Sequence, residues 1–188
     1  MAKLEIIRIG HPTLNKVAKK MNKEEILSSE TANLVADMYE TMQTAQGIGL
    51  AAPQVNISKQ LAIIHIPESS KRYKDLENLK PEQEKFVIFN PLITILDPTP
   101  QGMWEGCLSV PGIRGFVERP QKIKIDYLNT EAKNCQLILD GLLATVFQHE
   151  LDHLFGVIFL QRIQNTKLIS FSEEYDKFIA PIKFSEKE

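Results

Sequence analysis

The sequence lacks long apolar runs and lacks a large excess of charge of either sign. No run approaches the roughly 18 apolar residues that cross a bilayer, and the opening residues, MAKLEIIRIG, hold no apolar core of a signal peptide. The 22 basic and 24 acidic side chains leave a formal charge of −2, which argues against a surface for nucleic acid or anionic membranes. We therefore expect a cytoplasmic protein with no membrane partner and no sequence-specific nucleic-acid partner.

Cysteine is also scarce, since the chain has only Cys107 and Cys135. The two could form one disulfide, but without a secretion signal a reduced thiol or a metal ligand is favoured. Cys135 lies in a predicted strand, which indicates a buried structural thiol. Cys107 lies in a stretch rich in glycine and proline, residues 104–115, that we predict to be irregular. A sulfur in such a loop is free to face a ligand.

The hydrophobic pattern predicts an α+β fold, with mixed or antiparallel strands packed around a central helix. Hydrophobic residues make up 43% of the 188 positions, which is enough for one domain with a buried core. Extended segments are expected at 4–9, 61–66, 86–96, 122–128 and 135–139. Helices are expected at 12–19, 23–46, 141–156 and 167–178. Residues 67–84 are polar and charged, which predicts a surface excursion.

The central helix has the sequence GLLATVFQHELDHLFG, with Asp140 before it as N-cap and Gly156 at its end. His149 and His153 are four residues apart, so they share one helix face, and Glu150 follows the first of them. Two imidazoles so placed can hold a metal ion with an acid beside it. The alternative is a buried helix whose histidines form hydrogen bonds in the core. Glu150 argues against that alternative, because an unpartnered carboxylate is costly on an apolar face.

A catalytic metal usually has three protein ligands, so a third ligand must come from elsewhere. A histidine six residues after His153 would fit one protease class, but that position is Phe159. A downstream glutamate, Glu173 or Glu174, would fit another class. The third candidate is Cys107, which would bind as a thiolate. The spacing of the residues leaves the last two candidates open.

Three blocks of sequence resemble the signature motifs of the peptide deformylase family, and they occur in that family's order. The blocks are GIGLAAPQ (47–54), EGCLS (105–109) and QHELDH (148–153). The opening IIRIGHPTLNKVAKKM is similar to the family's N-terminal segment. The resemblance implies a metal-dependent hydrolase that removes the formyl group from the formyl-methionine of nascent polypeptides and releases formate. It extends over residues 5–163, so we expect a single catalytic domain at 1–163 and a C-terminal extension at 164–188, helical and then charged.

The resemblance also implies the chemical roles at the site. It makes Cys107, His149 and His153 the metal ligands, with water as the fourth. The family uses Fe(II) in the cell and accepts zinc, nickel or cobalt in the purified protein. Glu150 is then the general base. The side-chain amide of Gln54 and the backbone N–H of Leu108 would stabilise the oxyanion.

The expected substrates are N-formyl-methionyl peptides, which must lie in extended form against residues 47–55, where side chains would obstruct them. The resemblance implies backbone pairing at Ile48 and Gly49. An apolar pocket for the methionine side chain is expected from Ile48, Met103, Leu142 and Val146. Arg114 is expected to bind the peptide. For the apolar residues the alternative role is plain core packing, and for Arg114 it is a surface position.

Two further contacts are expected around this site. Arg119 is expected to pair with Asp152 and brace the metal-binding helix. The extension at 164–188 is a candidate for docking near the nascent-chain exit of the ribosome. A non-catalytic metal-binding or peptide-binding module would lack a base or an oxyanion donor, yet Glu150 and Gln54 are both present.

Overall fold

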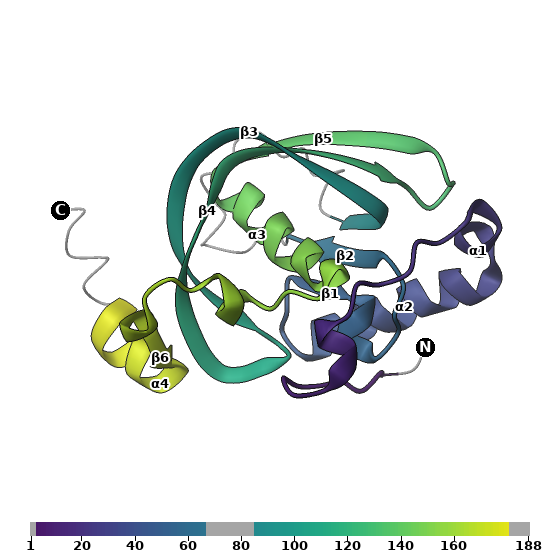
Figure 1. Ribbon diagram of the computed structural model, residues 1–188. Coiled ribbons are helices and arrows are strands. Elements are labelled where there is room, and N and C mark those ends of the chain that lie inside the picture. The colour runs from purple at the N-terminus through teal and green to yellow at the C-terminus, as the bar shows by residue number, and fades with distance from the viewer. Residues whose placement is uncertain (1–2, 67–84, 181–188) are drawn as a thin grey trace.

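The computed structural model describes residues 3–66 and 85–180. These residues form an antiparallel sheet with helices, which confirms the α+β class (Figure 1). The strand order is β1-β2-β3-β4-β5, and β6 pairs with β4. The strands are β1 (Gly49–Ala51), β2 (Leu61–His65), β3 (Lys85–Cys107), β4 (Val110–Leu128), β5 (Asn134–Asp140) and β6 (Ile169–Phe171).

Strands β3 and β4 form a long hairpin that bends around the central helix (Figure 1). Their pairing has register shifts, one of them between Phe89 and Leu92, where Asn90 has a φ of 49°. The prediction of an irregular stretch at 104–115 was wrong, because these residues form the closed end of this hairpin. The glycine and proline content suggested a loop, but pairing across the hairpin keeps the stretch extended. The Trp104 and Phe116 rings, for example, pack across the two strands with their centroids 6.0 Å apart.

The predicted helix at 23–46 is two helices, α1 (Lys23–Leu27) and α2 (Ser29–Thr44). Ser28 separates them, because its backbone is extended and its side chain accepts a hydrogen bond from the Thr31 N–H at 3.2 Å. Apolar residues keep their spacing of three and four across this break, so the sequence pattern could not reveal that the helix is interrupted.

Two predictions near the N-terminus also need correction. The helix expected at 12–19 is only a 3-10 turn at Pro12–Asn15, because the chain then extends and Lys19 forms a bridge with Lys59. The segment at 4–9 joins no strand of the described sheet. It is held by single hydrogen bonds, such as the one from the Ile7 N–H to the Gln54 carbonyl at 2.9 Å.

Helix α3 (Gly141–Asp152) lies at the centre and contacts β1, β2, β4 and β5 (Figure 1). Phe147 anchors it, with its ring 5.0 Å from that of Phe86 in an edge-on contact. Asp140 is at the N-cap position as predicted, although its side chain forms no capping hydrogen bond. The α-helix ends earlier than expected, and a 3-10 turn at His153–Phe155 continues it.

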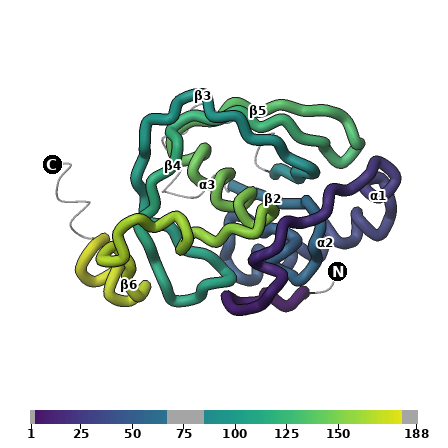
Figure 2. The backbone as a smooth tube through the Cα atoms, viewed as in Figure 1, coloured from purple at the N-terminus to yellow at the C-terminus, as the bar shows by residue number. Residues whose placement is uncertain are grey.

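Gly156 ends this turn, as the sequence predicted, and two constraints require a glycine there. Its φ is 73°, and a Cβ would collide with the backbone of Asn15 and Lys16. The N–H of Ala18 donates to the Leu154 carbonyl at 2.9 Å, so the N-terminal segment lies against the end of the central helix (Figure 2).

The C-terminal segment differs from the helix expected at 167–178. It contains a 3-10 turn at Thr166–Leu168, then β6, then the short helical elements α4 (Ser172–Glu174) and Tyr175–Ile179. Strand β5 pairs with β4 only from Lys122 onward, so the edge of β4 at 113–115 is available to β6.

The expected surface excursion at 67–84 and the charged tail at 181–188 lie outside the described residues. Within the described part of the chain, no helix is long and apolar enough to cross a membrane.

Candidate active site

Three side chains that could hold a metal ion gather at one end of the β3–β4 hairpin. Cys107 is the last residue of β3, His149 lies in α3, and His153 begins the turn after it. One ligand atom from each lies within 4.8 Å of the other two, and Cys107 Sγ is 3.4 Å from His153 Nε2. Among the described residues, this is the one group of at least three such side chains that could hold a metal ion.

The donor set fits a metal ion. His149 Nδ1 lies 2.7 Å from the Glu105 carboxylate, which leaves the other ring nitrogen, Nε2, available to bind a metal ion. His153 Nδ1 is buried and has no hydrogen-bond partner among the described residues. Burial lowers the pKa of His153 well below its ordinary value, which favours the neutral form of the imidazole that binds metals. Two imidazoles and a thiol suit a tetrahedral site with one open position.

Glu150 lies next to this cluster, buried beneath β1. Its Oε2 has no hydrogen-bond partner among the described residues. A Cβ on Gly49 would lie on the Glu150 carboxyl group, so only glycine permits this approach. Burial raises the pKa of Glu150 to about 7, with Glu105 acting in the same direction against His149 and Arg119. A carboxyl group with such a pKa can both accept and return a proton near neutral pH.

Gln54 presents its amide N–H groups to the cluster. Its side chain is only 1% exposed, which excludes a solvated loop position. Its Oε1 accepts a hydrogen bond from the Ala51 N–H at 2.8 Å, and this fixes which end faces the site. Its Nε2 donates to Cys107 Sγ at 3.4 Å and to Ser109 Oγ at 3.3 Å. The arrangement places a rigid donor beside the sulfur.

A single cavity of ≈ 540 Å³ contains almost all of the predicted site residues. Only His153 lies outside its lining. Ile48, Gly49, Gln54, Met103, Cys107, Leu108, Arg114, Leu142, Val146, His149 and Glu150 all line it. Glu173 and Glu174, the alternative third ligands, lie exposed on α4 and outside the ligand cluster.

A sequence profile of the family described as polypeptide deformylase matches residues 3–168. The chain belongs to the polypeptide deformylase family. It is thus a peptide deformylase, an enzyme that hydrolyses the N-formyl group from peptides. A peptide deformylase from Leptospira biflexa is 42% identical over 94% of this chain and 96% of its own length.

Solved deformylase structures share the fold. One from Synechococcus elongatus, in complex with actinonin, has a TM-score of 0.76 at 34% identity, over 94% of this chain and 86% of its own. A class I type b deformylase from Acinetobacter baumannii, bound to Met-Ala-Ser, has a TM-score of 0.77 at 36% identity, over 86% of this chain and 99% of its own.

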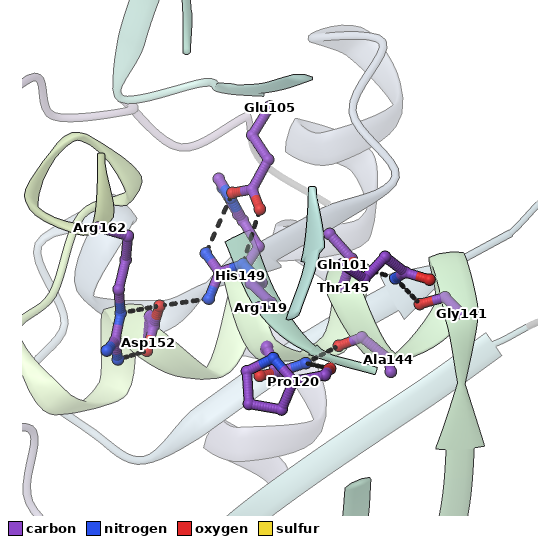
Figure 3. Close-up of polar contacts among 11 residues, drawn as sticks. Gln101, Glu105, Arg119, Pro120, Gly141, Ala144, Thr145, His149, Asp152 and Arg162 are labelled. Atoms are coloured by element: carbon purple, nitrogen blue, oxygen red, sulfur yellow. Dashed lines mark hydrogen bonds and ion pairs between the residues drawn. The ribbon is translucent and has the colours of Figure 1, made fainter. Parts of the chain in front are cut away.

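A buried ionic network lies next to the cluster of Cys107, His149 and His153 (Figure 3). Arg119 donates to both oxygens of Glu105, at 2.6 and 3.0 Å, and to Asp152 at 2.8 Å. The predicted pair of Arg119 with Asp152 is therefore confirmed. Arg162 reaches Asp152 from the surface at 2.7 Å. Despite its burial, Glu105 has a pKa of about 2, because hydrogen bonds from His149 and Arg119 stabilise its anion.

Sequence reasoning assigned no role to Glu105, Ser109 or Arg162. Glu105 lies two residues before Cys107, and in a strand such residues point to the same face. Recognising the strand at 104–107 would have placed this carboxylate beside the ligands. Ser109 and Arg162 gave no comparable local signal, because their partners lie 55 and 10 residues away.

Thr145 places a polar side chain in the lining of the cavity. Its hydroxyl accepts a hydrogen bond from Gln101 Nε2 at 3.0 Å, and Gln101 also donates to the Gly141 carbonyl at 2.7 Å (Figure 3). The hydroxyl therefore helps to hold the start of α3 against β3. Leu142 and Val146, on the same helix, line the cavity with apolar side chains.

Proposed function

We propose that this deformylase removes the formyl group from the N-terminal formyl-methionine of nascent polypeptides. The observation that carries the proposal is the ligand cluster of Cys107, His149 and His153, with Glu150 and Gln54 beside it in one cavity. The Acinetobacter baumannii relative bound to Met-Ala-Ser, a peptide that begins with methionine, supports this substrate class.

Glu150 is proposed as the general base and acid. Water adds to the formyl carbonyl carbon, and the Glu150 carboxylate accepts the proton that this water releases. The same carboxyl group returns the proton to the amine nitrogen as the C–N bond breaks. The products are formate and a peptide with a free amino terminus. The buried position of Glu150, with one oxygen unpartnered among the described residues, supports this role.

Two donors are proposed to stabilise the negative charge that develops on the formyl oxygen. One is Gln54 Nε2, whose orientation is fixed by the hydrogen bond from Ala51. The other is the backbone N–H of Leu108, in the turn between β3 and β4. Both residues line the cavity beside Cys107. A rigid donor aimed at developing charge lowers the barrier without reorganising during the reaction.

Substrate contacts are proposed along the remaining lining of the cavity. The backbone of Ile48 and Gly49, at the start of β1, would pair with the extended peptide. The side chains of Leu142, Val146 and Met103, with Ile48, would surround the methionine side chain. Arg114 would bind peptide carbonyls or a carboxylate. The lining of the cavity by all of these residues supports the assignment.

Cys107, His149 and His153 are proposed as ligands of Fe(II) in the cell, with zinc, nickel or cobalt able to replace it in purified protein. When bound, such an ion supplies a Lewis acid and lowers the pKa of a coordinated water. The mixed nitrogen and sulfur donors suit all of these metals. Metal analysis of protein purified without oxygen would identify the ion, and a preparation free of these four metals would contradict the proposal.

We also propose a cytoplasmic location, a catalytic domain at residues 1–163 and a ribosome-docking role for the extension at 164–188. Nascent polypeptides arise at the ribosome, so docking near the exit of the nascent chain would bring the enzyme to its substrate. Co-sedimentation with ribosomes, compared between the full chain and a chain ending at Gln164, would test this. Equal co-sedimentation would rule out docking through the extension.

Formate release from formyl-Met-Ala-Ser by anaerobically prepared, metal-loaded protein is the direct test of the function. We expect activity in the wild type and a loss of roughly 10²–10⁴-fold in kcat for Glu150→Ala. Glu173→Ala, which changes an exposed glutamate on α4, is the matched control and should retain full activity. No formate from the wild type would refute the function, and full activity of Glu150→Ala would refute the base.

A further inference from the structure

The first residues after the family match help to form the substrate cavity. The match ends at residue 168, and Ser172 lines the same cavity as Cys107 and Glu150. Strand β6 brings it there, by pairing with the part of β4 that directly follows the ligand-bearing hairpin end. Figure 1 shows this yellow segment lying against the bend of β3 and β4.

Two kinds of contact hold the segment in place. Three backbone pairs join β6 to β4, with Ser170 opposite Arg114. Beyond them, the Tyr175 ring packs on the Trp104 ring at a centroid distance of 5.2 Å. Trp104 is buried and itself lines the cavity. The segment is therefore attached to two residues of the cavity wall, Arg114 and Trp104, from the outside.

The part of the wall near Ser172 has unused hydrogen-bonding capacity. Arg114 Nε is buried and has no partner among the described residues. The Arg114 guanidinium lies over Gly106, where a Cβ would collide with it, next to the ligand Cys107. With the formyl group at Glu150 and the methionine side chain against Leu142, these donors are left for the following residues. A serine hydroxyl and a guanidinium both suit peptide carbonyls.

We propose that Ser172, held in place by β6, forms with Arg114 a subsite for the peptide residues that follow the formyl-methionine. This inference rests on the proposed deformylation of nascent chains and extends it. The enzyme would then bind part of its substrate with residues beyond the family-wide match. The subsite should affect the binding of longer substrates and leave the chemical step unchanged, because Ser172 belongs to neither the ligand cluster nor the proton-transfer groups.

The test compares formyl-Met amide with formyl-Met-Ala-Ser as substrates of metal-loaded full-length protein. For Ser172→Ala we expect KM for the tripeptide to rise about two- to tenfold, the value of one hydrogen bond. We expect kcat for both substrates and KM for the amide to be unchanged. Ser170→Ala is the matched control, since Ser170 is in the same segment but does not line the cavity. Its constants should equal those of the wild type.

Tyr175→Ala provides a second variant, because it removes the ring contact with Trp104 and loosens the segment. It should raise KM for the tripeptide selectively as well. An unchanged tripeptide KM in both variants, or an equal KM rise for both substrates, would overturn the subsite. Absence of formate from either substrate with the wild type would instead overturn the deformylation itself, so the two failures are distinguishable.

Discussion

At the scale of single residues, two buried glutamates near the same ligands have opposite ionisation behaviour. Burial raises the pKa of Glu150 to about 7, while His149 and Arg119 outweigh burial at Glu105 and hold its pKa at about 2. One carboxyl group can exchange a proton near neutral pH, and the other stays ionised and orients His149. Environment alone separates their roles.

Gln54 offers the sharpest test of a single side chain. Gln54→Leu keeps the approximate shape of the side chain but removes the amide donor that we propose for the developing oxyanion. We expect kcat to fall by about 10²–10³-fold. Gln60→Leu is the control, since Gln60 is also a buried glutamine, donates to the Ala18 carbonyl and does not line the cavity. Its kcat should stay unchanged even if its stability falls. Similar kcat values for Gln54→Leu and wild type would exclude the oxyanion role.

At the scale of elements, Arg119 connects β3, β4 and α3 through one guanidinium. It lies on β4 and bonds Glu105 on β3 and Asp152 on α3. The elements that carry Cys107 and His149 are therefore fixed to each other by a buried charge cluster. Such a cluster fixes geometry more effectively than it adds net stability, because desolvation offsets most of the attraction.

Replacing Arg119 should show how far the fold depends on this buried charge cluster. Arg119→Met leaves the buried Glu105 carboxylate without its cation and leaves Asp152 paired with Arg162 alone, so we expect a loss of about 3–5 kcal/mol in the free energy of unfolding. The Arg162 side chain, the outer partner of Asp152, is 48% exposed. Arg162→Met should therefore lower the free energy of unfolding by less than about 1 kcal/mol. Urea denaturation followed by circular dichroism measures both. Equal losses in the two variants would contradict the assignment of the buried connection to Arg119.

Helix α2 is joined to β3 by a tyrosine whose ionisation should affect stability at high pH. Burial raises the pKa of Tyr39 to about 12, and its hydroxyl donates to the Phe86 carbonyl at 3.1 Å. In the unfolded chain this pKa is about 10. The stabilisation is thus fully present below pH 10 and is lost as the pH rises towards 12.

Tyr39→Phe should remove this pH dependence. We expect the variant to be less stable by about 1 kcal/mol at pH 8, because one hydrogen bond is lost. Between pH 9 and 11.5 the wild type should lose more of its free energy of unfolding than the variant does. Urea midpoints across this range test the prediction, and parallel curves would show that Tyr39 does not contribute.

At the scale of the whole molecule, the cluster of Cys107, His149 and His153 joins the β3–β4 hairpin to the central helix. Cys107 comes from the end of the β3–β4 hairpin, while His149 and His153 come from the central helix and the turn after it. An ion held by all three residues binds the folded chain and not the unfolded one. Its binding free energy therefore adds to the stability of the entire domain.

Chelation should accordingly lower the melting temperature. A metal at a hundredfold excess over its dissociation constant stabilises by about 2.7 kcal/mol, which corresponds to about 5–10 °C for a domain of this size. Calorimetry of metal-loaded protein with and without chelator measures the shift. Cys107→Ala should lose most of this response, and a full response in that variant would exclude Cys107 as a ligand.

The sequence by itself determined the parts of the site that depend on local geometry. The helical repeat alone places His149 and His153 on one face, with Glu150 next to the first of them. The class of fold was also predictable, because the period of the apolar pattern distinguishes helices from strands.

Only the tertiary structure decided the rest, because it depends on pairing between distant segments. The stretch at 104–115 has a loop-like composition, and its pairing across the hairpin makes most of it strand, with Glu105 and Cys107 both on β3. The segment around Ser172 has a helical pattern, yet the open edge of β4 makes part of it β6 and brings it to the cavity. Local sequence sets what each backbone segment prefers. The partners that satisfy its hydrogen bonds are known only once the chain has folded.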